Sequence, residues 1–217
     1  MAQVINTNVS ALFAGAALNK SAIALQTAQQ RLSSGLRINS AKDDATGLVT
    51  ATNYDTSIRA ANAGVQVQNN VISTAQTNDG YLGVVTENLQ RILEIQAGNG
   101  GSAFTNAETT ALVAENTRIT GLAGVSIGSA ASTASADLTT VMGARANFGA
   151  QMATAASAIA TLQISSVNLS AAYSRVMDTD YAAETTAMTR NNILQQAGTA
   201  VLAQANQTPN TVLTLLR

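Results

Sequence analysis

Residues 11–32 read ALFAGAALNKSAIALQTAQQRL, and this stretch decides the fold class. Leu18, Leu25 and Leu32 follow Ala11 at intervals of seven residues, with alanines between them. Apolar residues at this spacing cover one narrow face of an α-helix, and such a face is stable in water when it packs on another helix. The stretch therefore predicts an amphipathic helix that needs a helical partner.

A second stripe of this kind lies near the other end of the chain. It consists of Ala187, Leu194, Ala197, Val201 and Ala205. Because both ends need a helical partner, we expect the two terminal helices to pack on each other or on neighbouring copies of the chain. This pattern favours self-assembly over catalysis. The side chains that we expect to carry the packing are Leu18, Leu25, Leu32, Leu194 and Val201.

The composition favours long helices over a thick core. Of the 217 residues, 46% are hydrophobic, but aromatic residues make up only 3% and tryptophan is absent. Much of the hydrophobic fraction is alanine, which forms helix well and buries little area. We therefore expect an all-α fold with at most a small β-hairpin, arranged as an elongated, discontinuous helical coiled-coil bundle built from the N- and C-terminal halves of the chain.

Charge and residue types exclude several classes of function. The net charge is −1 with no basic stripe, which argues against nucleic-acid binding. Cysteine and histidine are both absent, so disulfides, zinc sites and the usual nucleophile–base pairs cannot be built. We expect no catalytic, cofactor or metal site, and an enzyme is the least favoured reading.

The sequence predicts neither a membrane span nor a membrane-active helix. No run approaches the roughly 20 apolar residues of a span. Membrane-active helices are usually basic on the polar face, whereas the first 40 residues carry only Lys20, Arg31 and Arg37. No secretory signal is visible at the N-terminus, which taken alone predicts a cytoplasmic protein.

Turn and capping residues divide the chain into five helices. Gly35 is placed to end the first, and Ser40 with Asp43 resembles a weak capping box for the second. A glycine- and serine-rich segment, 121–140, contains a β-like run at 125–127 and predicts a small hairpin or irregular cap. The expected helices are 6–34, 45–97, 106–122, 140–177 and 180–217.

Two acidic clusters are better explained as helix starts than as sites. Asp178 and Asp180 could begin a calcium loop, but the twelfth position would be Thr189 and the sixth is not glycine, so helix capping is favoured. Asp43 and Asp44 are adjacent, and neighbouring residues on a helix point about 100° apart, so they do not face one substrate.

Several strings resemble bacterial flagellin. They are QRLSSGLRINSAKDDATGLVT at 30–50, MAQVINTNVSAL at 1–12, NLQRILEIQAGN at 88–99 and NNILQQAGTAVLAQANQTPNTVLTLLR at 191–217. The resemblance covers residues 1–120 and 140–217, with the motifs in the family's order. It implies a short form with only the inner helical domains of that family.

The resemblance implies a domain organisation. Residues 1–44 and 178–217 would form the inner terminal-helix domain with its connecting spoke, and 45–177 would form a coiled-coil rod capped by 121–140. Large outer variable domains would be absent, since only 123–140 occupy their place.

The resemblance also implies a function. The chain would be a structural subunit that self-assembles into the helical flagellar filament for motility. It would leave the cell unfolded through the flagellar type III apparatus without a cleaved signal. The resemblance therefore implies an extracellular location in place of the cytoplasmic one. The implied partners are itself, an export chaperone, the filament cap and the hook-associated proteins. A hook–filament junction protein is the alternative, and the match at 195–207 favours the filament subunit.

Two receptor epitopes are implied as well. Residues 30–51 resemble the segment read by the plant flagellin receptor, with Asp43 and Gly47 retained. Residues 89–95 resemble the epitope of the vertebrate Toll-like flagellin receptor. Its implied contacts are Arg91, Glu94, Ile95 and Glu115.

Overall fold

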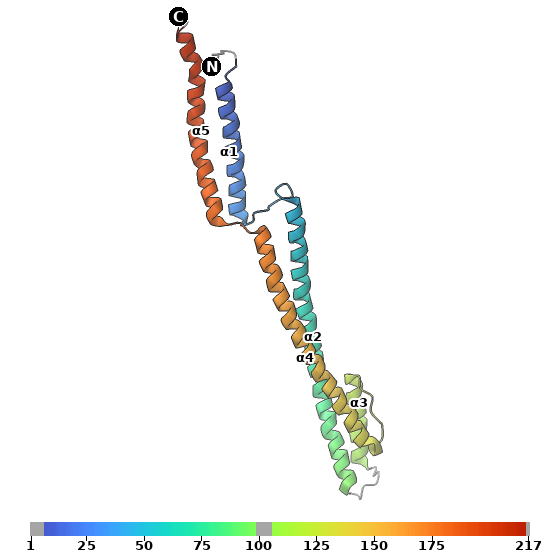
Figure 1. The fold of residues 1–217 in the computed structure, drawn as a ribbon. Coiled ribbons are helices and arrows are strands. Elements are labelled where there is room, and N and C mark those ends of the chain that lie inside the picture. The colour runs from blue at the N-terminus through green and yellow to red at the C-terminus, as the bar shows by residue number, and fades with distance from the viewer. Residues whose placement is uncertain (1–6, 99–105, 216–217) are drawn as a thin grey trace. The chain divides into compact units, whose positions relative to one another are not determined.

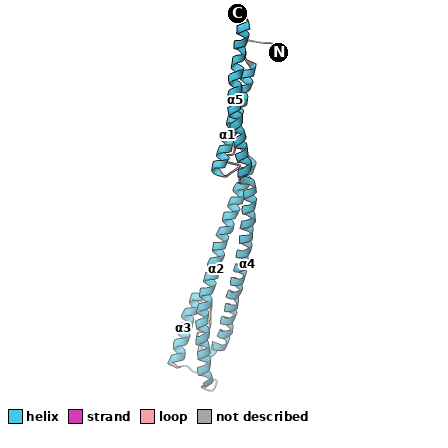
Figure 2. Ribbon diagram, turned by 90° about the vertical axis from the view of Figure 1, so that its left-hand side faces the viewer, coloured by secondary structure: helices cyan, strands magenta, loops and turns pink. Residues whose placement is uncertain are grey.

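The structure of this chain, a computed structural model, describes residues 7–98 and 106–215, with side chains as far as residue 207. The described residues are almost entirely helical, and no strand occurs among them (Figures 1 and 2). The all-α prediction is therefore confirmed. The elements are α1 (Val9–Ser34), α2 (Ala45–Gly98), α3 (Ala107–Ala123), the short 3₁₀ helix η1 (Ala131–Thr133), α4 (Ala134–Met177) and α5 (Tyr181–Leu215).

The ends of α1 follow from two local residues. Asn8 is the N-cap, and its side chain accepts a hydrogen bond from the Ala11 amide at 3.0 Å. Gly35 ends the helix in the left-handed conformation, with φ of 72°, which favours glycine because it has no Cβ. The predicted termination at Gly35 is confirmed, whereas residue 6, the expected start of the helix, lies outside the described residues.

The segment between α3 and α4 is irregular, which is one of the two alternatives that the sequence left open. No hairpin forms in it, and α4 begins at Ala134, six residues before the expected start. Asp137, in the first turn of α4, accepts hydrogen bonds from the Gly128 amide at 2.7 Å and the Thr133 hydroxyl at 2.6 Å. The side chain of Asp137 thus fixes the loop through hydrogen bonds, in place of the hydrogen bonds between strands that a hairpin would have.

Helix α5 begins where the sequence predicts. The Asp180 carboxylate accepts hydrogen bonds from the amides of Ala182 and Ala183, at 2.9 and 3.2 Å, which is the geometry of an N-cap. The capping interpretation of Asp180 is confirmed. The helix continues through Pro209 to Leu215, while the side chains of its apolar tip lie outside the described part.

The chain divides into two compact units. Unit 1 comprises Met1–Thr56 and Leu169–Arg217, and unit 2 comprises Ser57–Asn168. Each unit therefore joins a segment from the N-terminal half with one from the C-terminal half.

Unit 2 holds the larger apolar core. Its helices α2 and α4 also meet at Asp79, which accepts a hydrogen bond from the Arg145 guanidinium at 2.8 Å. The buried members of the core come from both of these helices, α3 and η1: Leu82, Val85, Leu89, Ile92, Ile119, Ala123, Ala131, Ala134 and Val141.

Unit 1 contains a small core where its two connecting segments cross. Ile38, Ala51 and Met177 are buried there. The crossing segments form an isolated antiparallel bridge, in which the Arg37 amide donates to the Met177 carbonyl at 2.6 Å and the Thr179 amide donates to the Gly35 carbonyl at 2.9 Å. These bonds hold the start of α5 beside the end of α1.

The turn before α2 uses both aspartates, but not as the predicted capping box. Asp43 closes the turn itself by accepting hydrogen bonds from the amides of Asn39 and Ser40, at 3.2 and 3.1 Å. Asp44, immediately before the helix, caps α2 by accepting from the Gly47 amide at 2.9 Å. The expectation that Ser40 and Asp43 cap α2 was therefore wrong, because Asp44 lies one residue closer to the helix start.

The Asp43 turn gives a prediction about pH. Hydrogen bonds, above all from the Ser40 amide, hold the pKa of Asp43 below its ordinary value. The turn contacts should therefore persist as pH falls through the ordinary aspartate range and weaken as pH falls through the lowered value. We expect an NMR titration to show the amides of Asn39 and Ser40 shifting together with the Asp43 carboxyl. Two results would contradict this prediction: titration of the Asp43 carboxyl at its ordinary pKa, or the same pH-dependent shifts of the two amides in the Asp43→Asn variant.

Candidate assembly surface

Helices α1 and α5 form a closely packed antiparallel pair (Figure 1). At one end the Asn8 side-chain amide donates to the Ala205 carbonyl at 2.8 Å, and at the other the Arg31 guanidinium lies 3.7 Å from the Glu184 carboxylate. The two helices contact each other along the pair. A close contact between helices requires small side chains at the interface.

Small residues supply that contact. On α1, Ala14, Ser21 and Ala28 are the buried residues, and they follow one another at intervals of seven. On α5, Gly198 lies so close to α1 that a Cβ there would be 3.2 Å from Leu18 Cδ1. The buried seam is therefore made of the small residues between the predicted leucines.

The structure divides the five predicted packing residues into two groups. Leu18, Leu25 and Leu32 are half-buried beside the seam. Leu194 and Val201 are 51% and 54% exposed, so each leaves about half of its surface in water beside the α1–α5 contact. The positions of α5 that are buried or half-buried include several polar or small residues: Glu184, Asn191, Asn192, Gln195, Gly198 and Ala205.

An apolar groove runs along one side of the pair, between the two helices, and reaches the buried seam. Its volume is about 640 Å³, and both helices contribute to it. Phe13, at 78% exposed, lies on it together with the exposed Leu194 and Val201. Large apolar side chains gathered on an exposed face mark an interaction surface. The full lining is Val9, Ser10, Phe13, Ala14, Ala17, Leu18, Ser21, Leu194, Ala197, Gly198, Val201 and Ala205.

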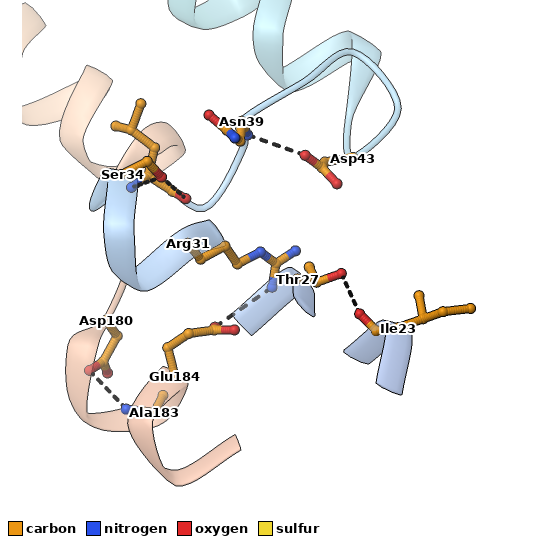
Figure 3. A network of polar contacts seen from close by, with 10 residues as sticks. Ile23, Thr27, Arg31, Ser34, Asn39, Asp43, Asp180, Ala183 and Glu184 are labelled. Atoms are coloured by element: carbon orange, nitrogen blue, oxygen red, sulfur yellow. Dashed lines mark hydrogen bonds and ion pairs between the residues drawn. The ribbon is translucent and has the colours of Figure 1, made fainter. Parts of the chain in front are cut away.

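Polar contacts hold the opposite end of the pair, next to the chain crossing (Figure 3). The Arg31 guanidinium extends from α1 toward Glu184 in the first turn of α5, close to the Asp180 cap. Acidic groups at this position suit the positive end of the helix dipole. Arg31 Nε is buried and has no hydrogen-bond partner. The contact with Glu184 therefore uses only part of the hydrogen-bonding capacity of the guanidinium.

Of the residues implied as a vertebrate receptor epitope, Arg91 and Glu94 are exposed on α2, whereas Ile95 of α2 and Glu115 of α3 are half-buried. Arg91 donates to Glu108 at 3.1 Å and to Glu94 at 3.3 Å, and these hydrogen bonds raise the pKa of Arg91. Glu115 accepts from Arg118 at 2.6 and 2.9 Å, and this contact lowers the pKa of Glu115. Sequence reasoning missed Glu108, since its pairing with Arg91 joins two helices and becomes visible only in the fold. It also missed Arg118, although the spacing of three residues from Glu115 on one helix is a signal that the sequence contains.

The residues implied as a plant receptor epitope lie in unit 1, where they build the start of α2. Asp43 closes the preceding turn. A side chain at Gly47 would have to displace neighbouring side chains, because a Cβ there would be 2.7 Å from Ile38 Cδ1. Both residues are thus engaged in the local fold.

Two features are absent from the described residues. No group of three or more His, Cys, Asp or Glu residues is gathered there. None of the described helices has the length and apolarity to cross a membrane. The outstanding surface feature is the apolar groove, and the molecule is a helical protein with an exposed, unpartnered apolar face.

Comparison with known proteins identifies the family. Residues 5–124 match the bacterial flagellin N-terminal helical region, and residues 131–216 match the bacterial flagellin C-terminal helical region. Only residues 125–130 separate the two matches. The chain belongs to the bacterial flagellin family, which is a family of structural proteins.

Individual flagellins agree with this assignment. The chain is 44% identical to a flagellin of Salmonella rubislaw over 118 residues, which cover 54% of this chain and 24% of that protein. It is 47% identical to a flagellin of Serratia marcescens over 111 residues, which cover 50% of this chain and 32% of that protein. With a flagellin of Xenorhabdus nematophila the alignment covers all of both chains at 31% identity.

The close approach at Gly198 can be tested against another helical glycine. A Cβ at Gly15 would meet nothing within 4 Å, whereas one at Gly198 would press on Leu18. We expect Gly198→Val to lower the stability of the α1–α5 pair by about 1–3 kcal/mol through overpacking. Gly15→Val should be neutral or slightly stabilising. Hydrogen exchange of α1 and α5 amides measures the difference, and equal effects of the two variants would show that the seam is not tight.

Proposed function

We propose that this chain is a structural subunit that assembles with copies of itself into the helical filament of the bacterial flagellum. The observation that carries the proposal is the apolar groove of Phe13, Leu194 and Val201, because a lone chain leaves this face in water. Burial of apolar area yields roughly 25 cal/mol per Å², so covering these side chains stabilises an assembly.

Membership of the flagellin family supports the helical form of the assembly. A head-to-tail contact that does not close on itself generates an open filament. The terminal helices, 1–44 with 178–217, act as the inner domain of the subunit, and 45–177 act as its rod. The filament is extracellular, and the chain reaches it unfolded through the flagellar type III apparatus, with an export chaperone, the filament cap and hook-associated proteins as further partners.

The groove can be tested by seeded polymerisation. Phe13→Gln removes a large apolar side chain from the groove, and Ile23→Gln removes one that is 64% exposed on the same helix outside the groove. We expect Phe13→Gln to slow filament growth at least tenfold in negative-stain or light-scattering assays, with a much smaller effect of Ile23→Gln.

Three results would contradict either the role of the groove or the filament itself. The groove is not the assembly face if both variants grow at the wild-type rate. Equal slowing of the two variants would indicate a general requirement for apolar surface on α1. If the wild-type chain stops at rings or stays monomeric with filament seeds present, the chain is a junction protein.

The monomer is also a ligand of innate flagellin receptors. Arg91 and Glu115 support this, since both are charged groups held in ion pairs on the surface of unit 2. Exposed pairs contribute only about 0–1 kcal/mol, so a receptor can exchange them for its own contacts at little cost. In unit 1, Asp43 and Gly47 are the corresponding residues for the plant receptor.

A reporter-cell assay tests the vertebrate receptor. Purified monomer should activate cells that carry the Toll-like flagellin receptor. Arg91→Ala should raise the half-maximal dose about tenfold or more, the equivalent of roughly 1.4 kcal/mol in affinity. Lys20→Ala, which removes a charge from α1 in unit 1, is the matched control. Absence of a response to saturating wild-type monomer would overturn the receptor proposal.

A further inference from the structure

The interface between α2 and α3 contains a polar contact within an otherwise apolar core. The side-chain amide of Asn88 donates to Asn116 Oδ1 at 2.8 Å. Asn116 is only 1% exposed, and its own Nδ2 has no hydrogen-bond partner. A buried amide that is only half satisfied destabilises the fold relative to an apolar side chain of similar size. The contact therefore requires an explanation other than stability.

The buried face of α3 as a whole is unusually polar. Three of its five buried residues are Thr109, Asn116 and Thr120, and the other two are Ile119 and Ala123. An interface of this kind is held less firmly by apolar burial than one made of leucine and isoleucine, so α3 needs another feature to fix its position along α2.

We propose that the Asn88–Asn116 contact determines the register in which α3 packs on α2. The inference is independent of the filament proposal. The two helices are antiparallel, because Asn88 meets Asn116 while Arg91, further along α2, meets Glu108, which comes earlier on α3. In this arrangement α3 could slide along α2 by one helical turn.

Sliding by one turn would separate the two amides. Asn116 would then face Val85 or Ile92, the residues three before and four after Asn88, and both of these are fully buried. Neither can accept or donate a hydrogen bond, so the whole Asn116 amide would be left unpaired in the core. The observed register is the one in which the two asparagines meet.

The register has a consequence for the surface. In the observed position Arg91 lies beside Glu108, and Glu94 joins them. A one-turn slide would carry Glu108 away from Arg91, so the Asn88–Asn116 contact also positions the charged groups of α3 relative to those of α2. Asn88 and Asn116 are positioning residues in this sense, since neither is itself on the surface that they align.

The test compares single and double substitutions in the full chain. Asn88→Leu strands a fully buried amide and Asn116→Leu strands its half-buried partner, so each should lower the urea midpoint. The double variant, Asn88→Leu with Asn116→Leu, removes both amides and should raise the midpoint above that of either single variant. A double variant no more stable than the singles would overturn the proposal, because the amides would then not depend on each other.

Spin labels measure the register directly. The chain has no cysteine, so Gln76→Cys and Thr110→Cys, both at exposed positions, provide two unique sites. We expect one narrow label-to-label distance with the native asparagines and, in the double leucine variant, a second population displaced by about 5 Å, one helical turn. If the double variant keeps only the original distance, or if α3 loses its helix, the register does not depend on the amide contact. Thr117→Ala, at an exposed position of α3, is the control and should leave the distance unchanged.

Discussion

The close approach of α1 and α5 is the constraint on which unit 1 depends. Ala14, Ser21 and Ala28 bring the two backbones near each other, and the absence of a side chain at Gly198 leaves space for Leu18. A seam of small residues excludes large side chains from the contact. Phe13, Leu194 and Val201 are therefore left on the outer face, where together they line an apolar groove.

The two units bury apolar groups to different extents. The largest fully buried side chains of the described chain all belong to unit 2: Leu82, Ile92, Val85, Val141, Asn116, Thr109 and Thr120. In the α1–α5 pair the buried residues are small, so the pair gains little from apolar burial within one chain. Helices of this kind depend mostly on packing for their stability, and in the proposed assembly the neighbouring copies supply more of that packing.

The sequence predicted helices better than it predicted contacts. Heptad spacing, Gly35 and Asp180 located most helix boundaries, because periodicity and capping are local properties. The hairpin at 125–127 was not found, since Asp137 ties that loop to α4 through hydrogen bonds that local propensity does not reveal. The heptad spacing placed the five expected packing residues on α1 and α5, but it did not show that Leu18 is half-buried while Val201 is 54% exposed. A narrow stripe in which small and large residues alternate is compatible with the buried seam and with the groove. Only the distance between the two helices distinguishes these positions. The Asn88–Asn116 contact was missed for a related reason, as it joins residues 28 positions apart.

The most direct measurement is the reactivity of a thiol placed in the groove. The chain has no cysteine, so Val201→Cys gives a single reporter, and Gln29→Cys gives one at an exposed position of α1 outside the groove. If neighbouring copies cover the groove, maleimide should label Val201→Cys readily in the monomer and at least tenfold more slowly after polymerisation, beyond any slowing at Gln29→Cys. Equal labelling rates of Val201→Cys in monomer and filament would mean that the groove stays open to water and that assembly uses another face.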